Sequence, residues 1–233
     1  MAQRIICNYA FSPIIFVAPH GYPGDDYNTD YIALKAAEHI SASFLINQGW
    51  RRNTHVDESQ DFADCNHVDH VSQPIIKDEF LDPYIRGCIR AKRNFSSCLA
   101  VFIHGVSDLV RKTSGVPDLD IILGYGLGKE NSTTVPEIVK NKFIHCLYKD
   151  DVKCCVGKSG GQYSGFSKNN MNQYWRKHHK DMHMMSMQLE IVRELREDKI
   201  MADLIASTIA DAVNEAFFCT SFQLPTNFKY ESV

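Results

Sequence analysis

The sequence predicts a protein of the α/β class, with helices on both faces of a mostly parallel central sheet. Short apolar runs alternate along the chain with segments of helical periodicity. The runs Ile14–Ala18 and Ser97–Ile103 are apolar throughout or nearly so, as expected for strands that are buried on both faces. Residues Ile200–Phe217 carry their apolar side chains on one helical stripe. No repeat and no linker interrupts the chain, so we expect a single domain over residues 1–233.

Strands are predicted wherever a short apolar run is bounded by turn residues. They are Ile14–Ala18, Asp61–Val68, Ser97–Ile103, Leu119–Leu123, Phe143–Tyr148 and Met185–Val192.

Helices are predicted from apolar spacing together with start and stop signals. The first begins at Asn28 or Thr29, either of which can cap it, and is expected to end near Gly49. Its apolar positions are 32, 33, 36, 37, 40 and 44. The second covers residues 80–94 and starts near Pro83, because proline suits a first helical turn. The third is Ile200–Phe217.

Composition limits the classes of partner. A net charge of −3 and a pI near 6.3 give no reason to expect nucleic acid or an anionic membrane. No apolar run reaches the roughly 18 residues of a membrane span, and the first residues do not resemble a signal peptide. The eight cysteines form no C-x-x-C pair. We therefore expect a cytoplasmic protein with reduced thiols, whose oligomeric state the sequence does not indicate.

A candidate site lies where two predicted strands end. The segment FVAPHGYPGDD contains the end of the strand Ile14–Ala18 and the turn after it, which carries His20, Asp25 and Asp26, while His104 follows the strand Ser97–Ile103. Ligands of such folds bind beyond the carboxyl ends of the strands, so both imidazoles are expected to face one crevice. Two histidines and a carboxylate form a hydrolytic zinc site that leaves a fourth position for water. The alternative is that each histidine caps or packs against its strand.

A candidate general base lies in the apolar segment Gln188-Leu189-Glu190-Ile191. A buried carboxyl needs a partner or a function, and burial would raise the pKa of Glu190 toward the range of a general base. The alternative is a structural ion pair with Arg193 or Arg196. The glycine-rich stretch 157–167 is interpreted as a mobile loop that covers the site.

Several short motifs occur in an order that resembles the N-formylglutamate amidohydrolase family. They are Pro19-His20-Gly21, Thr29-Asp30, Asp64-Cys65-Asn66, the apolar run ending in His104, Leu123-Gly124, Gly160-Gly161 and Gln188-Leu189-Glu190. The resemblance runs from about residue 14 to residue 215. It implies a three-layer α/β/α domain of the phosphorylase/hydrolase-like fold. It also implies a zinc-dependent hydrolase that cleaves the C–N amide bond of an N-acyl amino acid or a small peptide-like substrate.

The resemblance also implies roles for particular residues. His20 and His104 match the histidine ligands of one zinc ion per chain, and Glu190 matches the general base. The acidic ligand is Asp26, with Asp30 or Asp25 as the alternative. Substrate contacts are expected from Asn66, His67, Gly160 and Gly161 of the matched motifs, and from Arg193 outside them.

The chain departs from the family pattern at two places. The formylglutamate enzymes have D-x-N-R where this chain has His67 in the arginine position, and D-x-H-S where this chain has Ile103-His104-Gly105. Neutral histidine cannot hold a carboxylate bidentately as arginine does, which argues against N-formylglutamate itself as the substrate. A clamp from Arg51, Arg52, Arg86, Arg90 or Arg193 stays open. Two other functions also stay open: a non-catalytic relative that binds a peptide or metabolite, and a poly-γ-glutamate or cell-wall peptide amidase.

Overall fold

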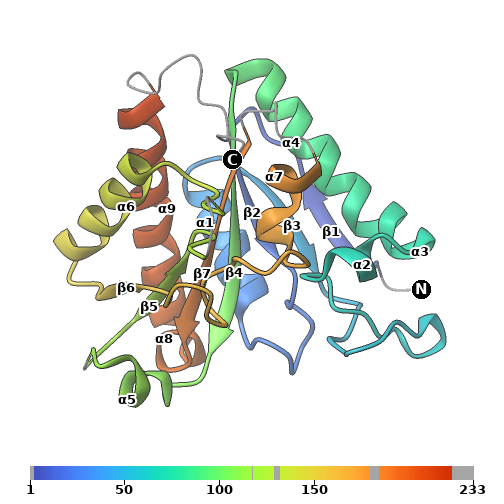
Figure 1. The fold of residues 1–233 in the computed structure, drawn as a ribbon, viewed down its shortest axis with the longest axis horizontal. Coiled ribbons are helices and arrows are strands. Elements are labelled where there is room, and N and C mark those ends of the chain that lie inside the picture. Colours follow the sequence, from blue (N-terminus) through green and yellow to red (C-terminus); the bar gives the residue numbers. More distant parts are fainter. Residues whose placement is uncertain (1–2, 117, 129–131, 179–183, 222–233) are drawn as a thin grey trace.

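A seven-stranded sheet forms the centre of the computed structural model, which describes residues 3–116, 118–128, 132–178 and 184–221 (Figure 1). The strands are β1 (Ile5–Asn8), β2 (Ile14–Ala18), β3 (Ser43–Asn47), β4 (Cys98–Val106), β5 (Ile121–Gly124), β6 (Cys154–Val156) and β7 (Met184–Val192). Their order across the sheet is β1-β3-β2-β4-β7-β5-β6. The pairs β1–β3 and β5–β7 are antiparallel, and the other neighbours are parallel. The predicted mixed, mostly parallel sheet is confirmed.

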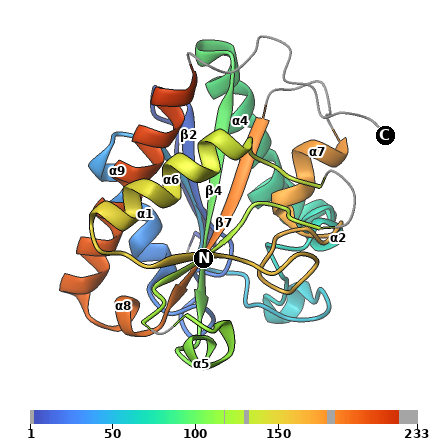
Figure 2. The same ribbon diagram turned by 60° about the vertical axis from the view of Figure 1, so that its left-hand side comes forward.

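Helices cover both faces of this sheet, so the predicted three-layer α/β/α architecture is confirmed (Figure 2). One face carries α1 (Thr29–His39), α6 (Glu137–Lys149) and α9 (Lys199–Ser221). The other face carries α2 (Val68–Val71), α3 (Pro74–Ile76), the π-helix η2 (Lys77–Leu81), α4 (Asp82–Phe95), the 3₁₀ helix η3 (Met171–Gln173) and α7 (Tyr174–His178). The connections hold the 3₁₀ helix η1 (Glu58–Gln60), α5 (Val110–Ser114) and α8 (Glu194–Glu197). None of the described helices is long and apolar enough to cross a membrane.

The central strands are apolar throughout because each supplies side chains to both cores. In β2, Phe16 packs under α1 and α9, whereas Val17 packs under α4. Neighbouring side chains of a strand point to opposite faces, so a strand between two helical layers needs apolar residues at every position. The strands β2, β4 and β7 lie side by side and parallel, so their carboxyl ends meet at one edge of the sheet.

The helix predicted up to Gly49 is wrong beyond His39. The chain turns at Ser41, whose φ is 53°, and the following residues form β3. Backbone N–H groups of Ser41 and Ala42 donate to the carbonyls of Glu38 and Ala37, which is the pattern of a Schellman motif. The usual signal for this ending is glycine, and serine in its place left the end of the helix unmarked in the sequence.

Two predicted strands are wrong for different reasons. Phe143–Tyr148 lies inside α6, where Val139, Phe143 and Leu147 form one buried helical stripe; a short apolar run does not distinguish strand from helix. Residues 61–68 form isolated bridges at Phe62 and His67, a turn between them and the first residue of α2, not a strand. In that turn the Asp64 carboxylate accepts the N–H of Asn66, and such local bonds compete with strand pairing.

Candidate metal centre

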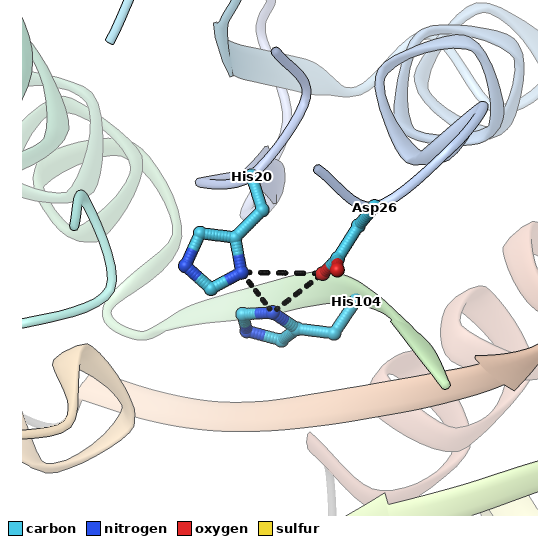
Figure 3. A group of neighbouring side chains, drawn as sticks. All are labelled: His20, Asp26 and His104. Atoms are coloured by element: carbon cyan, nitrogen blue, oxygen red, sulfur yellow. Dashed lines mark hydrogen bonds and ion pairs between the residues drawn. The ribbon is translucent and has the colours of Figure 1, made fainter. Parts of the chain in front are cut away.

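Three buried side chains converge where the carboxyl ends of β2 and β4 meet (Figure 3). His20 Nδ1 lies 3.2 Å from Asp26 Oδ2 and 3.3 Å from His104 Nδ1, and the third pair, His104 Nδ1 and Asp26 Oδ2, is 3.6 Å apart. His20 and Asp26 come from the turn after β2, whereas His104 lies within β4, which continues to Val106. One donor atom from each residue lies within 4.8 Å of the other two.

These distances fit a tetrahedral metal ion. Zinc binds histidine nitrogen and carboxylate oxygen at about 2.0–2.1 Å, which places tetrahedral ligands about 3.3 Å from one another. The three observed separations of 3.2, 3.3 and 3.6 Å are close to that edge length. Two imidazole Nδ1 atoms and one carboxylate oxygen are also a donor set that zinc prefers. The residues present therefore fit a zinc ion.

The turn after β2 is shaped to bring Asp26 back over His20. The backbone N–H of Asp26 donates to the carbonyl of His20, and the Thr29 hydroxyl donates to the carbonyl of Asp26. Gly21 lies against the backbone of β3, since a Cβ there would stand 2.7 Å from the Asn47 carbonyl oxygen. Larger residues at position 21 would push this turn away from the sheet.

A second carboxylate orients His20 from behind. His20 Nε2 lies 2.8 Å from Asp64 Oδ1, which leaves Nδ1 to face the other two ligand candidates. A carboxylate bonded to the far ring nitrogen fixes the tautomer that a metal requires. Burial alone would lower the pKa of His20, but the bonds to Asp26 and Asp64 outweigh it and raise the pKa to about 9. Despite burial, the bonds to His104 and His20 hold the pKa of Asp26 below its ordinary range, and the bond to His20 does the same for Asp64.

Glu190 lies beside the cluster because β7 pairs with β4 in a register that sets Glu190 opposite His104. Its Oε1 accepts a hydrogen bond from Gln188 Nε2 at 3.1 Å, and it forms no ion pair with Arg193 or Arg196. Burial, followed by the nearby charge of Asp26, raises the pKa of Glu190 to about 8. A carboxyl that titrates in this range suits proton transfer near neutral pH.

A cavity of about 280 Å³ opens in front of these residues. Its wall includes His20, Asp26, His104, Glu190, Asn66, Gln162, Tyr163, Asn170, Gln188 and Arg52. The Arg52 side chain is half exposed and lies 3.9 Å from both the Asp26 and the Asp64 carboxylates. It brings a guanidinium to a wall that is largely made of acids, histidines and amides, together with Tyr163 and Ser107.

The three aspartates that the sequence left as alternatives occupy different places. Asp26 joins the cluster, whereas Asp25 accepts the backbone N–H of Arg52 and Asp30 accepts an N–H of Gln48. Only Asp26 therefore presents its carboxylate to the two histidines.

The residues predicted to contact substrate are divided between the cavity and its surroundings. Asn66 lines the cavity, and His67 lines an adjoining cavity of about 570 Å³ that also contains Arg52, Asp64 and His70. Gly160 and Gly161 do not line either cavity; the next two residues of their loop, Gln162 and Tyr163, do.

Arg193 also lies away from the cavity. Its exposed side chain pairs with Glu197 at 2.6 Å, with no contact to the cluster.

Sequence reasoning did not assign several residues that the structure brings to the site. Asp64 stood in the Asp64-Cys65-Asn66 motif, and that motif was the available signal for it. Arg52 was only one of several arginines, and Gln188 was noted only as a neighbour of Glu190. Tyr163 belongs to the stretch 157–167 that was predicted to cover the site, although it was not singled out there, whereas nothing local distinguishes Asn170.

The fold is shared with known hydrolase structures. No family model matches the chain, and no curated protein matches it. A gene product of Agrobacterium tumefaciens aligns at a TM-score of 0.63 and 11% identity, over 96% of this chain and 97% of its own. The N-formylglutamate amidohydrolase of Ralstonia eutropha aligns at a TM-score of 0.58 and 14% identity, over 91% of this chain and 99% of its own. A bacteriophage poly-gamma-glutamate hydrolase aligns at a TM-score of 0.54 and 16% identity, over 94% of this chain and 90% of its own. The predicted resemblance is thereby confirmed at the level of the fold.

Proposed function

We propose that this protein is a zinc-dependent amidohydrolase that cleaves the C–N amide bond of an N-acyl amino acid or a small peptide-like substrate. The observation that carries the proposal is the convergence of three buried donor atoms, from His20, Asp26 and His104, beside a buried Glu190 with a raised pKa. The activities named for the structures of similar fold, an N-formylglutamate amidohydrolase and a poly-gamma-glutamate hydrolase, support the reaction class.

Each residue has a distinct part in this proposal. His20, Asp26 and His104 hold one zinc ion per chain, and a bound zinc ion supplies a Lewis acid that polarises a carbonyl and acidifies water. Glu190 takes the proton of the attacking water and delivers it to the leaving amine, which needs a carboxyl that exchanges protons near pH 7. Gln188 holds the Glu190 carboxyl in place through its amide N–H.

Arg52 is the residue we assign to the substrate's negative charge. It lines the cavity, and its guanidinium lies near the carboxylates of Asp26 and Asp64. A charge that develops on the scissile carbonyl, or a carboxylate beside it, would be stabilised there. Asn66 and His67 then contact the substrate from the same side, with imidazole in place of a guanidinium fork.

The setting of the site is also part of the proposal. We assign residues 1–233 to one hydrolase domain, because all described strands belong to one sheet. Cytoplasm is the proposed compartment, which agrees with eight cysteines that are all free.

The test compares metal content with hydrolysis in matched variants. Glu190→Gln is expected to keep about one zinc per chain and to lose at least about a hundredfold in kcat on a panel of N-acyl amino acids. His104→Ala is expected to lose stoichiometric zinc. Glu137→Gln, on the surface of α6, is the control that changes neither. An active Glu190→Gln enzyme would remove that residue from catalysis, and a wild-type protein that binds zinc without hydrolysing any amide would favour a binding protein.

A second substrate class is favoured by the adjoining cavity. Arg52 lines both the 280 Å³ cavity and the 570 Å³ cavity, so a longer chain has room to continue past the site. A poly-γ-glutamate or cell-wall peptide amidase would use this space. Higher kcat/KM on oligomers than on single acylated amino acids would support it, and equal values would argue for the smaller substrate.

A further inference from the structure

A buried arginine lies behind the candidate metal centre and is not paired with a carboxylate. Arg196, in α8, is 4% exposed. Within the described residues its guanidinium donates hydrogen bonds only to backbone carbonyls and forms no ion pair. A buried cation without a carboxylate partner is costly, so the hydrogen bonds that hold it must replace its lost contacts with water.

Its three acceptors belong to the three segments that carry the candidate site. Nε donates to the carbonyl of Ile191 at 3.0 Å, next to Glu190. Nη1 donates to the carbonyl of Tyr27, next to Asp26. Nη2 donates to the carbonyl of Val106 at 3.3 Å, two residues after His104. One rigid planar group therefore fixes the relative positions of β7, β4 and the turn after β2.

A further hydrogen bond, in which Arg196 is the acceptor, stabilises this arrangement. The side-chain amide of Asn28, at the start of α1, donates to the backbone carbonyl of Arg196 at 2.6 Å. Two hydrogen bonds thus join the turn that carries Asp26 to α8: one donated by Arg196 to Tyr27, and one donated by Asn28 to Arg196. Because Tyr27 and Asn28 directly follow Asp26, a shift of Arg196 would move that carboxylate.

Gly105 provides the space that the guanidinium occupies. A Cβ at this position would stand 2.5 Å from Arg196 Cζ and 2.6 Å from both Nη atoms. The backbone N–H of Gly105 also donates to Asp26 Oδ2 at 3.1 Å. This explains the glycine after His104, where the formylglutamate enzymes carry a serine: a side chain there would displace the guanidinium.

We propose that Arg196, together with Gly105, is a positioning residue that sets the geometry of His20, Asp26 and His104 for metal binding. The inference rests on the proposed function, since it assigns a role toward the zinc that those three residues would hold. Arginine is required because its planar fork serves three carbonyls at once, whereas lysine offers a single point of attachment.

The experiment measures zinc affinity, by competition with a chromophoric chelator at pH 7, in folded protein. Arg196→Met and Arg196→Lys are expected to bind zinc about 10–100-fold more weakly than wild type, the range found when groups that orient metal ligands are lost. Arg111→Met is the control. Arg111 also donates Nε to a backbone carbonyl, that of Leu119, but it pairs with the carboxylates of Asp120 and Glu194 and does not line the cavity. Its loss is expected to lower thermal stability and to leave the zinc affinity unchanged.

Gly105→Ala tests the same geometry with Arg196 still present, and serves if the Arg196 variants do not fold. It is expected to weaken zinc binding at least about tenfold, and to add little further loss in an Arg196→Ala background, where the space is vacant. Wild-type affinity in folded Arg196→Met, or in Gly105→Ala, would overturn the positioning role while leaving the proposed hydrolase intact. A wild-type protein that binds no zinc would overturn both.

Discussion

At the scale of single residues, Asp64 determines which nitrogen of His20 is available to a metal. Its carboxylate lies 2.8 Å from Nε2 and also accepts the N–H of Asn66, so its position is fixed by two contacts. A neutral amide in its place would accept the same proton more weakly and would let the ring turn.

Asp64→Asn is therefore expected to weaken zinc binding by about 10–100-fold without unfolding the protein. Competition with a chelator at pH 7 measures the change. Asp69→Asn is the matched control, because Asp69 lies nearby on α2 with its side chain exposed. Equal affinities of the wild type and the Asp64 variant would mean that the ring of His20 is held by its surroundings alone.

The residues of the candidate site differed in how far sequence could identify them. His20 and His104 follow or end apolar runs, and Glu190 interrupts one, so each stands out against its neighbours. The choice among Asp25, Asp26 and Asp30 could not be made in this way. It depends on a turn in which the Asp26 N–H reaches back to the His20 carbonyl, and residue spacing does not specify that turn.

At the scale of elements, the main error was the predicted end of α1. The turn at Ser41 that ends this helix has a measurable conformational cost. Ser41 holds a φ of 53°, which costs a residue with a Cβ about 1–2 kcal/mol relative to glycine. The errors at Phe143–Tyr148 and at residues 61–68 arose differently, since a buried helical stripe and an aspartate turn each overrode a plausible strand pattern. Strands flanked on both sides by helices, such as β2 and β7, were predicted well because burial on both faces leaves a continuous apolar run.

Ser41→Gly is expected to raise the free energy of unfolding by about 0.5–1 kcal/mol, because relief of the left-handed backbone exceeds the extra flexibility of glycine in the unfolded chain. Urea denaturation measures it, with an unchanged slope as the sign of an unchanged unfolded state. Ser207→Gly, inside α9, should instead destabilise the protein by about 0.5 kcal/mol. If both substitutions destabilised the protein, Ser41 would not be under backbone strain.

At the scale of the whole molecule, the site exists only because distant strands are neighbours. His20 and His104 are 84 residues apart in the chain, and β7 must enter the sheet next to β4 before Glu190 can face His104. Apolar runs predict that strands exist but not their order across the sheet. Only the structure therefore gives the order β2-β4-β7 and the cavity. The same holds for the positions of Arg52 and Arg196 around the site.

The metal-free protein is expected to lose stability as pH rises from about 6.5 to 9. The pKa of His20 is raised from 6.5 to about 9 because its bonds to Asp26 and Asp64 outweigh its burial. Protonated His20 therefore contributes fully to the free energy of unfolding below pH 6.5, and this contribution is lost as pH passes 9. Burial raises the pKa of Glu190 from 4.5 to about 8. The stability that depends on protonated Glu190 is therefore also lost as pH rises between those two values. His104, whose pKa is lowered by burial, acts oppositely but only below pH 6.5.

Thermal melts of zinc-free protein at several pH values measure this dependence. Zinc competes with the proton on His20, so the gain in melting temperature on adding zinc should grow over the same interval. Glu190→Gln removes one of the two titrating groups, and the zinc-free variant should show a shallower decline than wild type between pH 6.5 and 8. A melting temperature that stays constant or rises with pH in zinc-free wild type would mean that His20 is not held in its charged form by Asp26 and Asp64. In that case the two carboxylates would not form the ligand and orienting pair around this imidazole.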